Sequence, residues 1–313
     1  MSAPNVTIVL CTRNRARMLD DALSSLAALE TAGFEFEILV VDNGSTDDTA
    51  KVVAAAAAEA RVAIRCASEP HPGVAFARNR GVIESRGQWL AFFDDDQLAH
   101  PRWLIELLAM AHAKNVRCVG GAVHLKLPAG QQRNLSPFCR LLLGETTGMT
   151  EPRMYSFTVT PGAGNLMLQR SVFDEVGLFN ETLNTRGEDT ELFLRIHARG
   201  IEAWYTPAAM VSHVIPPERL SDRYLMSISR LMVRGMADDE RRHWGRALFP
   251  LVWAARSMQA LFLLIPRLAW AHVRRDHERT LGARCRLRLA QGYLSDGLEL
   301  IVPGISLRRS SDC

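Results

Sequence analysis

Three consecutive carboxylates, Asp94, Asp95 and Asp96, follow an apolar run at 89–93. Adjacent negative charges repel one another, so this arrangement costs stability unless a cation binds nearby. Because side chains alternate along a strand, we expect Asp94 and Asp96 to face the same side if strand geometry continues. Such oxygen ligands suit a hard cation, Mg²⁺ or Mn²⁺, which keeps positions open for substrate phosphates. The alternative is a solvated acidic loop.

Polar residues also follow two other apolar runs of the sequence. Thr12, Arg13 and Asn14 come directly after "VTIVLC", and Asp42 ends the run "FEILVVD". In open parallel sheets, ligands bind beyond the carboxyl ends of the strands. We therefore expect these side chains to lie on the same rim as the three aspartates.

The first 120 residues alternate short apolar runs with stretches typical of helices. The runs predict strands at 6–11, 36–42, 62–68 and 88–94. Continuously apolar strands separated by helices indicate a parallel sheet covered on both faces. Right-handed crossovers then give a doubly wound α/β layer. Farther along, 188–200 predicts an amphipathic helix that ends at a glycine.

Five segments of the sequence, in this order and spacing, resemble the family 2 glycosyltransferases. They are "VTIVLCTRNR", "FEILVVDNGSTDDT", "ARNRGVIESRGQWLAFFDDD", "GAGNLMLQRSVFDEVGLFNE" and "GEDTELFLRIHARG". Each motif alone is weak, but five at compatible spacing are specific. The resemblance covers roughly residues 5–215 and implies the GT-A fold, a nucleotide-diphosphate sugar donor and inversion at the transferred carbon.

The resemblance implies roles for the acidic triplet and for one histidine. Asp94 and Asp96 correspond to the DxD pair, with Asp96 as the direct metal ligand and Asp94 or Asp95 near the ribose. His213, in "AAMVSHVIPP", corresponds to a further metal ligand of some members. The cofactor is then Mn²⁺ or Mg²⁺. The alternative for His213 is a structural residue in an apolar stretch.

The resemblance also assigns residues to the nucleotide. Asp42 corresponds to the aspartate that accepts a hydrogen bond from the base, and the loop Thr12, Arg13 and Asn14 flanks the base. Arg78, in "ARNRG", corresponds to a basic residue near the nucleotide. As alternatives, Asp42 caps the helix that follows, and Arg78 is an ordinary surface residue of a helix.

The acidic pair in "GED" is the predicted catalytic centre. A sugar acceptor hydroxyl is a poor nucleophile and needs a carboxylate to take its proton. In the resembling family the aspartate of this pair is the base, which here is Asp189, with Glu188 beside it. The alternative is purely structural, because acidic residues are favoured in a first helical turn by the helix dipole.

The carboxyl-terminal third differs in composition. Residues 241–288 hold 11 arginines and two acidic residues, a net charge of +9, whereas the first 240 residues carry −5. Within this part, 247–265 is mostly apolar but contains Arg256, whose insertion into a bilayer costs about 2.5–3.5 kcal/mol. We expect an interfacial or re-entrant segment on an anionic membrane surface. The alternatives are a transmembrane span, a helix hairpin packed on the catalytic domain, or a homodimer interface.

The sequence is therefore interpreted as a GT-A catalytic domain at 1–215 and a helical, membrane-associating region at 216–313. The expected activity is metal-dependent, inverting transfer of a sugar to a glycan or lipid-linked acceptor, in cell-envelope or exported polysaccharide synthesis. No signal peptide is predicted, so we expect a cytoplasmic protein, peripheral on the inner face of the membrane. A nucleic-acid partner is not expected, because the arginines are interleaved with aliphatic residues. The alternatives are a nucleotidyltransferase or an inactive nucleotide-sugar-binding scaffold.

Overall fold

The computed structural model describes residues 4–130, 133–183, 186–233 and 235–302. The chain divides into two compact units. The first comprises the described residues up to Lys126 together with Gly144–Val214, and the second comprises Leu127–Leu143 together with the described residues from Ile215 onward. The functional division predicted at residue 215 stays a prediction. Leu127–Leu143, which precede that position in the sequence, belong with the second unit.

A mixed sheet forms the centre of the first unit, in the order β3-β2-β1-β4-β8-β6-β9-β5, with β7 paired to β9. Its strands are β1 (Val6–Thr12), β2 (Phe36–Asp42), β3 (Ala63–Ser68), β4 (Trp89–Asp94), β5 (Gln97–Ala99), β6 (Cys118–Lys126), β7 (Arg153–Met154), β8 (Asn165–Gln169) and β9 (Ala203–Val214). The four strands from β3 to β4 are mutually parallel, and antiparallel pairing begins where β8 joins β4. The predicted α/β class is confirmed.

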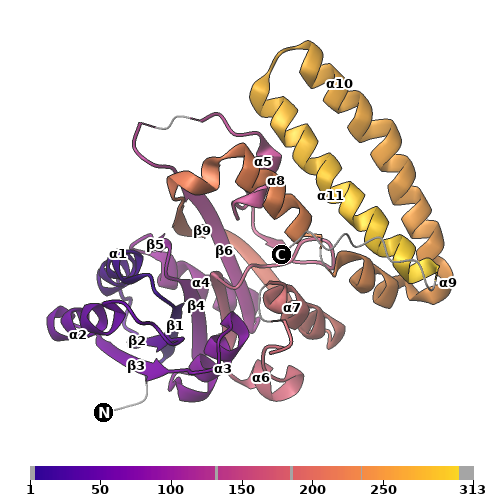
Figure 1. Cartoon of the computed structure of the whole chain (residues 1–313). Coiled ribbons are helices and arrows are strands. Elements are labelled where there is room, and N and C mark those ends of the chain that lie inside the picture. The colour runs from indigo at the N-terminus through magenta and orange to yellow at the C-terminus, as the bar shows by residue number, and fades with distance from the viewer. Residues whose placement is uncertain (1–3, 131–132, 184–185, 234, 303–313) are drawn as a thin grey trace. The chain divides into compact units, whose positions relative to one another are not determined.

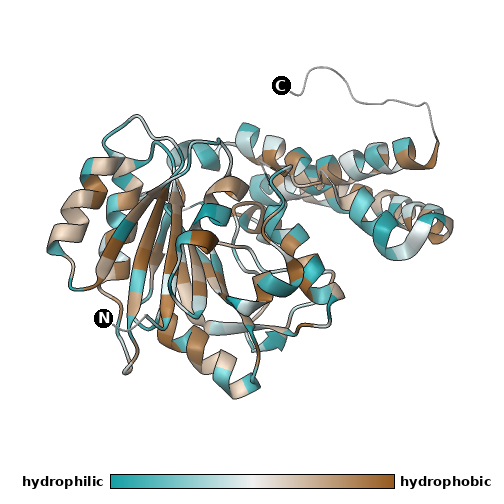
Figure 2. Cartoon of the chain, turned by 90° about the horizontal axis from the view of Figure 1, so that it is seen from below, coloured by the Kyte–Doolittle hydropathy of each residue, from teal (hydrophilic) through white to brown (hydrophobic). Residues whose placement is uncertain are grey.

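Helices cover both faces of this sheet. They are α1 (Ala16–Ala27), α2 (Thr49–Glu59), α3 (Val74–Glu84), α4 (Trp103–Lys114), α6 (Ser171–Val176) and α7 (Glu188–Ala198). Alternate residues of β1 point to different cores: Ile8 and Leu10 pack with α1 and α4, whereas Val9 packs with α3, α6 and α7. This double coverage explains why the strands are continuously apolar, and Figure 2 shows them as hydrophobic bands between the helices.

The parallel register sets the positions of the polar residues at the strand ends. Thr12 of β1 lies opposite Asp42 of β2, and Cys11 of β1 lies opposite Asp94 of β4. Neighbouring strands are about 4.8 Å apart, so Asp42 and Asp94 are separated by two strand spacings, about 10 Å. The predicted common rim therefore forms.

Helix α3 packs closely against the middle of β1. A Cβ at Gly81 would overlap Val9 Cγ1, so a glycine is needed for the helix to approach β1. One turn earlier on the same helix, the buried Arg78 is held against the strand ends.

The second unit is helical. It contains α5 (Pro137–Leu142), the short η1 (Pro217–Leu220), α8 (Asp222–Leu231), α9 (Met236–Gln259), the π-helical turn η2 (Ala260–Leu264), α10 (Ile265–Val273) and α11 (His277–Ile301). Figure 1 shows α9, η2 and α10 running beside α11 as a long hairpin. A small core of Val233, Ala237, Phe249 and Tyr293 joins them.

The apolar run predicted at 247–265 lies on this hairpin. Arg256, which interrupts it, pairs with Glu240 at 3.0 Å, so its charge is compensated within the unit. The helix α9 is broken at Gly245, which has a φ of 77°. By length and composition the stretch Asp222–Val273 could cross a membrane, and only 11% of its most apolar window is buried. Core helices of soluble proteins meet the same criteria of length and composition, so a span does not follow.

Candidate active site

The acidic triplet lies in a turn. Strand β4 ends at Asp94, the chain turns at residues 95 and 96, and β5 begins at Gln97. We expected Asp94 and Asp96 to share a side if strand geometry continued. This condition is not met, because the extended geometry ends before Asp96. Asp94 instead pairs with Arg78, and Asp95 and Asp96 both contact Arg15. These cations lower the mutual repulsion of the three carboxylates.

Both carboxylate oxygens of Asp95 are engaged by side chains from the first part of the chain. Its carboxylate accepts hydrogen bonds from Thr12 Oγ1 at 2.8 Å and from Arg15 Nη1 at 2.8 Å. Burial raises the pKa of Asp95, and Arg15 and Thr12 act in the opposite direction. Because both oxygens are engaged, Asp95 ties the β4–β5 turn to the end of β1. Arg15 also contacts Asp96 Oδ2 at 3.2 Å.

Arg78 links two acidic residues that are distant in sequence. Its guanidinium donates to Asp94 Oδ1 at 3.3 Å and also to Glu188 Oε1. Burial alone would lower the pKa of Arg78, but Asp94, Glu188 and Asp189 together raise it. Arg78 is buried, so the alternative of an ordinary surface residue is wrong.

Glu188 and Asp189 open α7 at this rim. Burial raises the pKa of Glu188, and the ion pair with Arg78 opposes that shift. Its Oε2 is buried without a hydrogen-bond partner among the described residues. Asp189 is half-buried, and its Oδ2 accepts from the Ala163 N–H at 3.3 Å. A helix-dipole role alone does not explain why Glu188 is buried and paired across the chain.

The glycine-rich loop before β8 approaches these carboxylates closely. A Cβ at Gly164 would overlap Asp94 Oδ2 and would lie 2.6 Å from Gln97 Nε2. A Cβ at Gly162 would lie 3.9 Å from Asp189 Oδ2, an ordinary contact. Gly164 is therefore required for Asp94 to occupy its position.

His213 reaches the triplet from β9. Its Nε2 lies 3.5 Å from Asp96 Oδ2, because β9 pairs with β5 and places His213 opposite Gln97. No group of three or more His, Cys, Asp or Glu side chains within the described ranges is arranged to hold a metal by itself. Asp96 and His213 nevertheless converge as two ligand-type groups, which fits an ion that takes its remaining ligands from substrate and water.

A second polar group lies around the end of β2. Asp42 Oδ1 accepts from the Ser45 N–H at 2.9 Å, and Asn14 Oδ1 accepts from the Thr46 N–H at 2.7 Å. The first bond lies within the turn after β2, and the second joins that turn to the loop after β1. Asp42 therefore shapes its own turn. The helix-cap alternative is wrong, because α2 begins at Thr49, whose N–H donates to Asp47. Arg13 is exposed.

The structure thus brings most predicted residues together. Arg78, Asp96, His213 and Asp189 all lie near enough to Asp94 to influence its charge. The sequence analysis did not select Arg15, which is the last residue of the "TRNR" motif. The only sequence signal for Arg15 is its position directly after the selected residues Thr12, Arg13 and Asn14.

Comparison with known proteins identifies the family. Residues 4–237 match the model of the family described as Glycosyltransferase like family 2. The chain belongs to this family. The predicted resemblance is therefore confirmed.

Two relatives illustrate the range of this family. The validoxylamine A glucosyltransferase of Streptomyces hygroscopicus subsp. jinggangensis is 32% identical over 231 residues, covering 63% of this chain and 52% of that protein. The succinoglycan biosynthesis protein ExoM of Rhizobium meliloti is 28% identical over 226 residues, covering 71% and 70% of the two chains. The matched region spans only 24% of the length of another curated relative.

A solved structure shares the fold. The mannosyltransferase PcManGT from Pyrobaculum calidifontis, solved in complex with GDP-Man and Mn²⁺, matches with a TM-score of 0.61 at 17% identity, covering 93% of this chain and 88% of that one. The predicted GT-A fold is confirmed by this likeness.

Proposed function

We propose that this family 2 glycosyltransferase moves a sugar from a nucleotide-diphosphate sugar to a hydroxyl group of a glycan or lipid-linked acceptor. The observation that carries the proposal is the convergence of Asp94, Asp96, Asp189 and Arg78 at the carboxyl ends of β1 and β4. Three carboxylates and a buried arginine in one cluster suit a reaction that handles a diphosphate and a proton.

The donor lies along the rim in this proposal. The base is near Asp42 and the loop Thr12–Asn14, and the ribose is near Asp94 or Asp95. The separation of about 10 Å between the two strand ends leaves room for a nucleoside between them. Arg78 is a positioning residue, because it holds Asp94 and Glu188 at fixed distances from each other.

Asp96 and His213, with Asp94 beside them, would hold a divalent ion, Mn²⁺ or Mg²⁺. The ion would stabilise the negative charge that develops on the leaving nucleoside diphosphate. The related mannosyltransferase, whose structure contains GDP-Man and Mn²⁺, supports this choice.

Asp189 is the general base of the proposal. Its Oδ2 is oriented by the Ala163 N–H, at the edge of the loop that borders Asp94. Asp189 takes the proton of the acceptor hydroxyl as that oxygen forms a bond to the anomeric carbon and the bond to the diphosphate breaks. Attack opposite the leaving group inverts the anomeric configuration.

The acceptor belongs to an envelope or exported polysaccharide in this proposal, and the enzyme is peripheral on the inner face of the membrane. The relationship to a succinoglycan biosynthesis protein supports the first part. The +9 segment 241–288 and the exposed apolar side chains of α9, η2 and α10 support the second.

A thermal-shift panel tests the donor and metal together. Uridine, guanosine, cytidine and thymidine diphosphates and their sugars are added with and without Mn²⁺. At about 100 times its Kd, a ligand stabilises the folded state by about 2.7 kcal/mol, so one nucleotide should raise the Tm by several degrees. The rise should be larger with Mn²⁺. A panel in which no nucleotide changes the Tm contradicts the proposal.

Gly164→Ala tests the geometry of the acidic cluster around Asp94. The added Cβ would collide with Asp94 Oδ2 and Gln97 Nε2, so the carboxylate must move. A displacement of about 1 Å can lower turnover by roughly 10²-fold. We expect kcat/KM to fall by about this factor, measured by nucleoside diphosphate release.

Gly162→Ala is the matched control, because its Cβ makes only an ordinary contact with Asp189. We expect its kcat/KM to stay within about threefold of the unchanged enzyme, since a 3.9 Å contact needs no side chain to shift. Equal losses in the two variants would show that the loop, and not the position of Asp94, limits turnover.

A further inference from the structure

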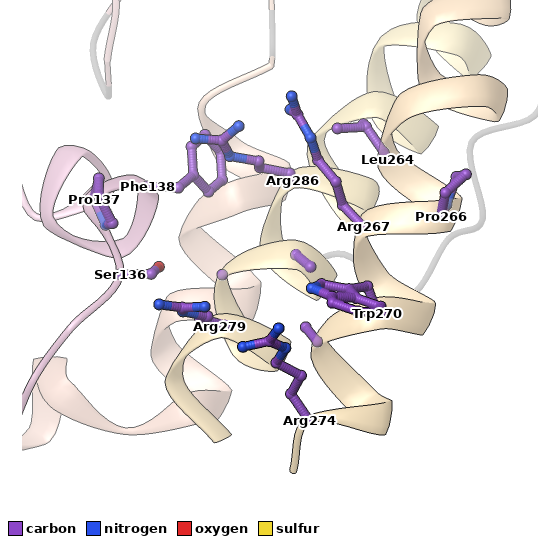
Figure 3. Close-up of a pocket in the computed structure, with 13 residues that line it drawn as sticks. Ser136, Pro137, Phe138, Leu264, Pro266, Arg267, Trp270, Arg274, Arg279 and Arg286 are labelled. Atoms are coloured by element: carbon purple, nitrogen blue, oxygen red, sulfur yellow. The ribbon is translucent and has the colours of Figure 1, made fainter. Parts of the chain in front are cut away.

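The second unit contains a hollow that the proposed transferase chemistry does not use. It has a volume of about 580 Å³, within the range typical of small-molecule sites. Figure 3 shows its walls, formed by the start of α5, by α10 and by α11. The lining residues are Ser136, Pro137, Phe138, Leu264, Pro266, Arg267, Trp270, Ala271, Arg274, Arg279, Gly282, Ala283 and Arg286.

The hollow is strongly basic. Four of its lining residues are arginines, and none of these described lining residues is acidic. Arg279 pairs with Asp276 at 3.1 Å. The other three, Arg267, Arg274 and Arg286, form no ion pair with any residue that the structure describes. Their charge is therefore available to an anion.

Aromatic rings hold two of these arginines in place. The guanidinium of Arg274 lies 4.7 Å from the centre of the Trp270 ring, and that of Arg286 lies 5.0 Å from the centre of the Phe138 ring. Stacking fixes the plane of a guanidinium and leaves its N–H groups free at the edge, where they match phosphate oxygens. This arrangement of the arginines suits the binding of a phosphate group, and solubility alone would not require it.

A glycine makes the hollow possible. A Cβ at Gly282 would overlap Ser136 Oγ, so α11 approaches the start of α5 only because residue 282 has no side chain. This contact brings Phe138 beside Arg286 and closes one wall. The hollow is therefore built by a specific helix contact and is not a gap between loosely packed helices.

The surroundings of the hollow are apolar and exposed. Large hydrophobic side chains of η2 and α10 face solvent next to it: Leu261, Phe262, Leu263, Ile265, Trp270 and Val273. Such a surface is costly in water and fits the apolar part of an amphiphile. Nucleic acid would use the arginines and the two aromatic rings but has no partner for the aliphatic side chains Leu261, Leu263, Ile265 and Val273.

We propose that this hollow binds the phosphate head group of an anionic membrane lipid, with the acyl chains along the apolar side chains of η2 and α10. The inference rests on the membrane association proposed above and goes beyond it by assigning a defined site. No covalent step is involved. The lipid would anchor the second unit through a discrete contact in addition to diffuse attraction between the +9 segment and the membrane.

Vesicle sedimentation of the full chain tests this proposal. Vesicles of phosphatidylcholine, with or without phosphatidylglycerol, are compared for three proteins. The pocket variant carries Arg267→Gln, Arg274→Gln and Arg286→Gln. The matched control carries Arg242→Gln, Arg246→Gln and Arg288→Gln, which remove the same charge from positions outside the hollow.

We expect the unchanged protein to bind only the anionic vesicles and the pocket variant to bind them at least about tenfold more weakly. The control should lose less than about threefold. Equal losses in both variants would overturn the site and leave diffuse attraction as the explanation. If the unchanged protein binds neither kind of vesicle, both the site and the membrane association are wrong.

Two further arms identify the ligand. Dihexanoylphosphatidylglycerol should raise the Tm of the unchanged protein but not of the pocket variant, whereas inorganic phosphate at the same concentration should have little effect. Equal shifts from both would assign the hollow to a free anion and overturn the lipid site. So would tighter binding of a single-stranded oligonucleotide than of the vesicles. Nucleoside diphosphate shifts in the pocket variant should stay unchanged, which separates this proposal from that for donor binding.

Discussion

Asp189→Asn is expected to lower kcat by roughly 10²–10⁴-fold, the usual contribution of a general base. The substitution keeps the size of the side chain and an oxygen that can accept from the Ala163 N–H. It removes the ability to take a proton at neutral pH. Nucleoside diphosphate binding, followed by the shift in Tm, should be unchanged, because the loss lies in the chemical step.

Glu191→Gln provides a matched control on the same helix. Glu191 lies two residues later in α7 and pairs with Arg195 at 2.9 Å, not with the acidic cluster around Asp94. Its loss should cost only about 0.3–0.5 kcal/mol of stability and leave kcat near that of the unchanged enzyme. Near-normal turnover by Asp189→Asn would exclude Asp189 as the base.

Glu188→Gln separates catalysis from positioning within the acidic pair. Glu188 is buried against Arg78, so its replacement leaves the arginine with a weaker partner and mainly costs stability. We expect a lower Tm and a modest fall in kcat, with the pH profile of kcat retained. The Asp189 variant should instead lose most of its kcat, because the general base is gone.

The sequence was sufficient to locate the ends of the strands that carry Asp42 and Asp94. Strands buried on both faces must be continuously apolar, and a polar residue that ends such a run must lie at the rim. This reasoning located Asp42 and Asp94 correctly, since both are the last residues of their strands. It depends only on local composition and on the parallel arrangement.

Contacts between residues that are far apart in the sequence could not be predicted from local sequence patterns. Arg15 pairs with Asp95 and Asp96 about 80 residues away, and the turn at Asp95 removes the alternation that was expected. Asn165, the first residue of β8, donates hydrogen bonds from its side chain to the backbone of β6 and β9. These contacts join segments that are distant in the sequence, so they depend on the folded arrangement of the chain.

The second unit posed a similar difficulty. The +9 charge and the apolar run were visible in composition, and both predict a membrane surface. The hollow was not visible, because it combines Phe138 with Trp270 and Arg286, which lie on three different helices. A charge pattern identifies a basic face, whereas a site requires the fold.

Asp96→Ala is expected to reduce kcat at least about 10³-fold, the equivalent of the several kcal/mol that a bound divalent ion can supply to a leaving group. Asp96 Oδ2 is the atom that Arg15 and His213 both approach, at 3.2 Å and 3.5 Å. Removing it would leave only His213 and Asp94 of the proposed ligands. The Mn²⁺-dependent part of the nucleotide-induced rise in Tm should therefore disappear, while the part seen without Mn²⁺ should persist.

Asp95→Asn is the control variant for the Asp96→Ala experiment. Asp95 lies next in the chain, but its oxygens are engaged by Thr12 and Arg15, so its replacement should lower the Tm and keep the Mn²⁺ effect. If instead Asp95→Asn abolishes the Mn²⁺ effect and Asp96→Ala preserves it, the ion is held on the β1 side of the turn. His213, which contacts Asp96 from β9, would then be a structural residue, and the assignment of the metal ligands would have to be exchanged.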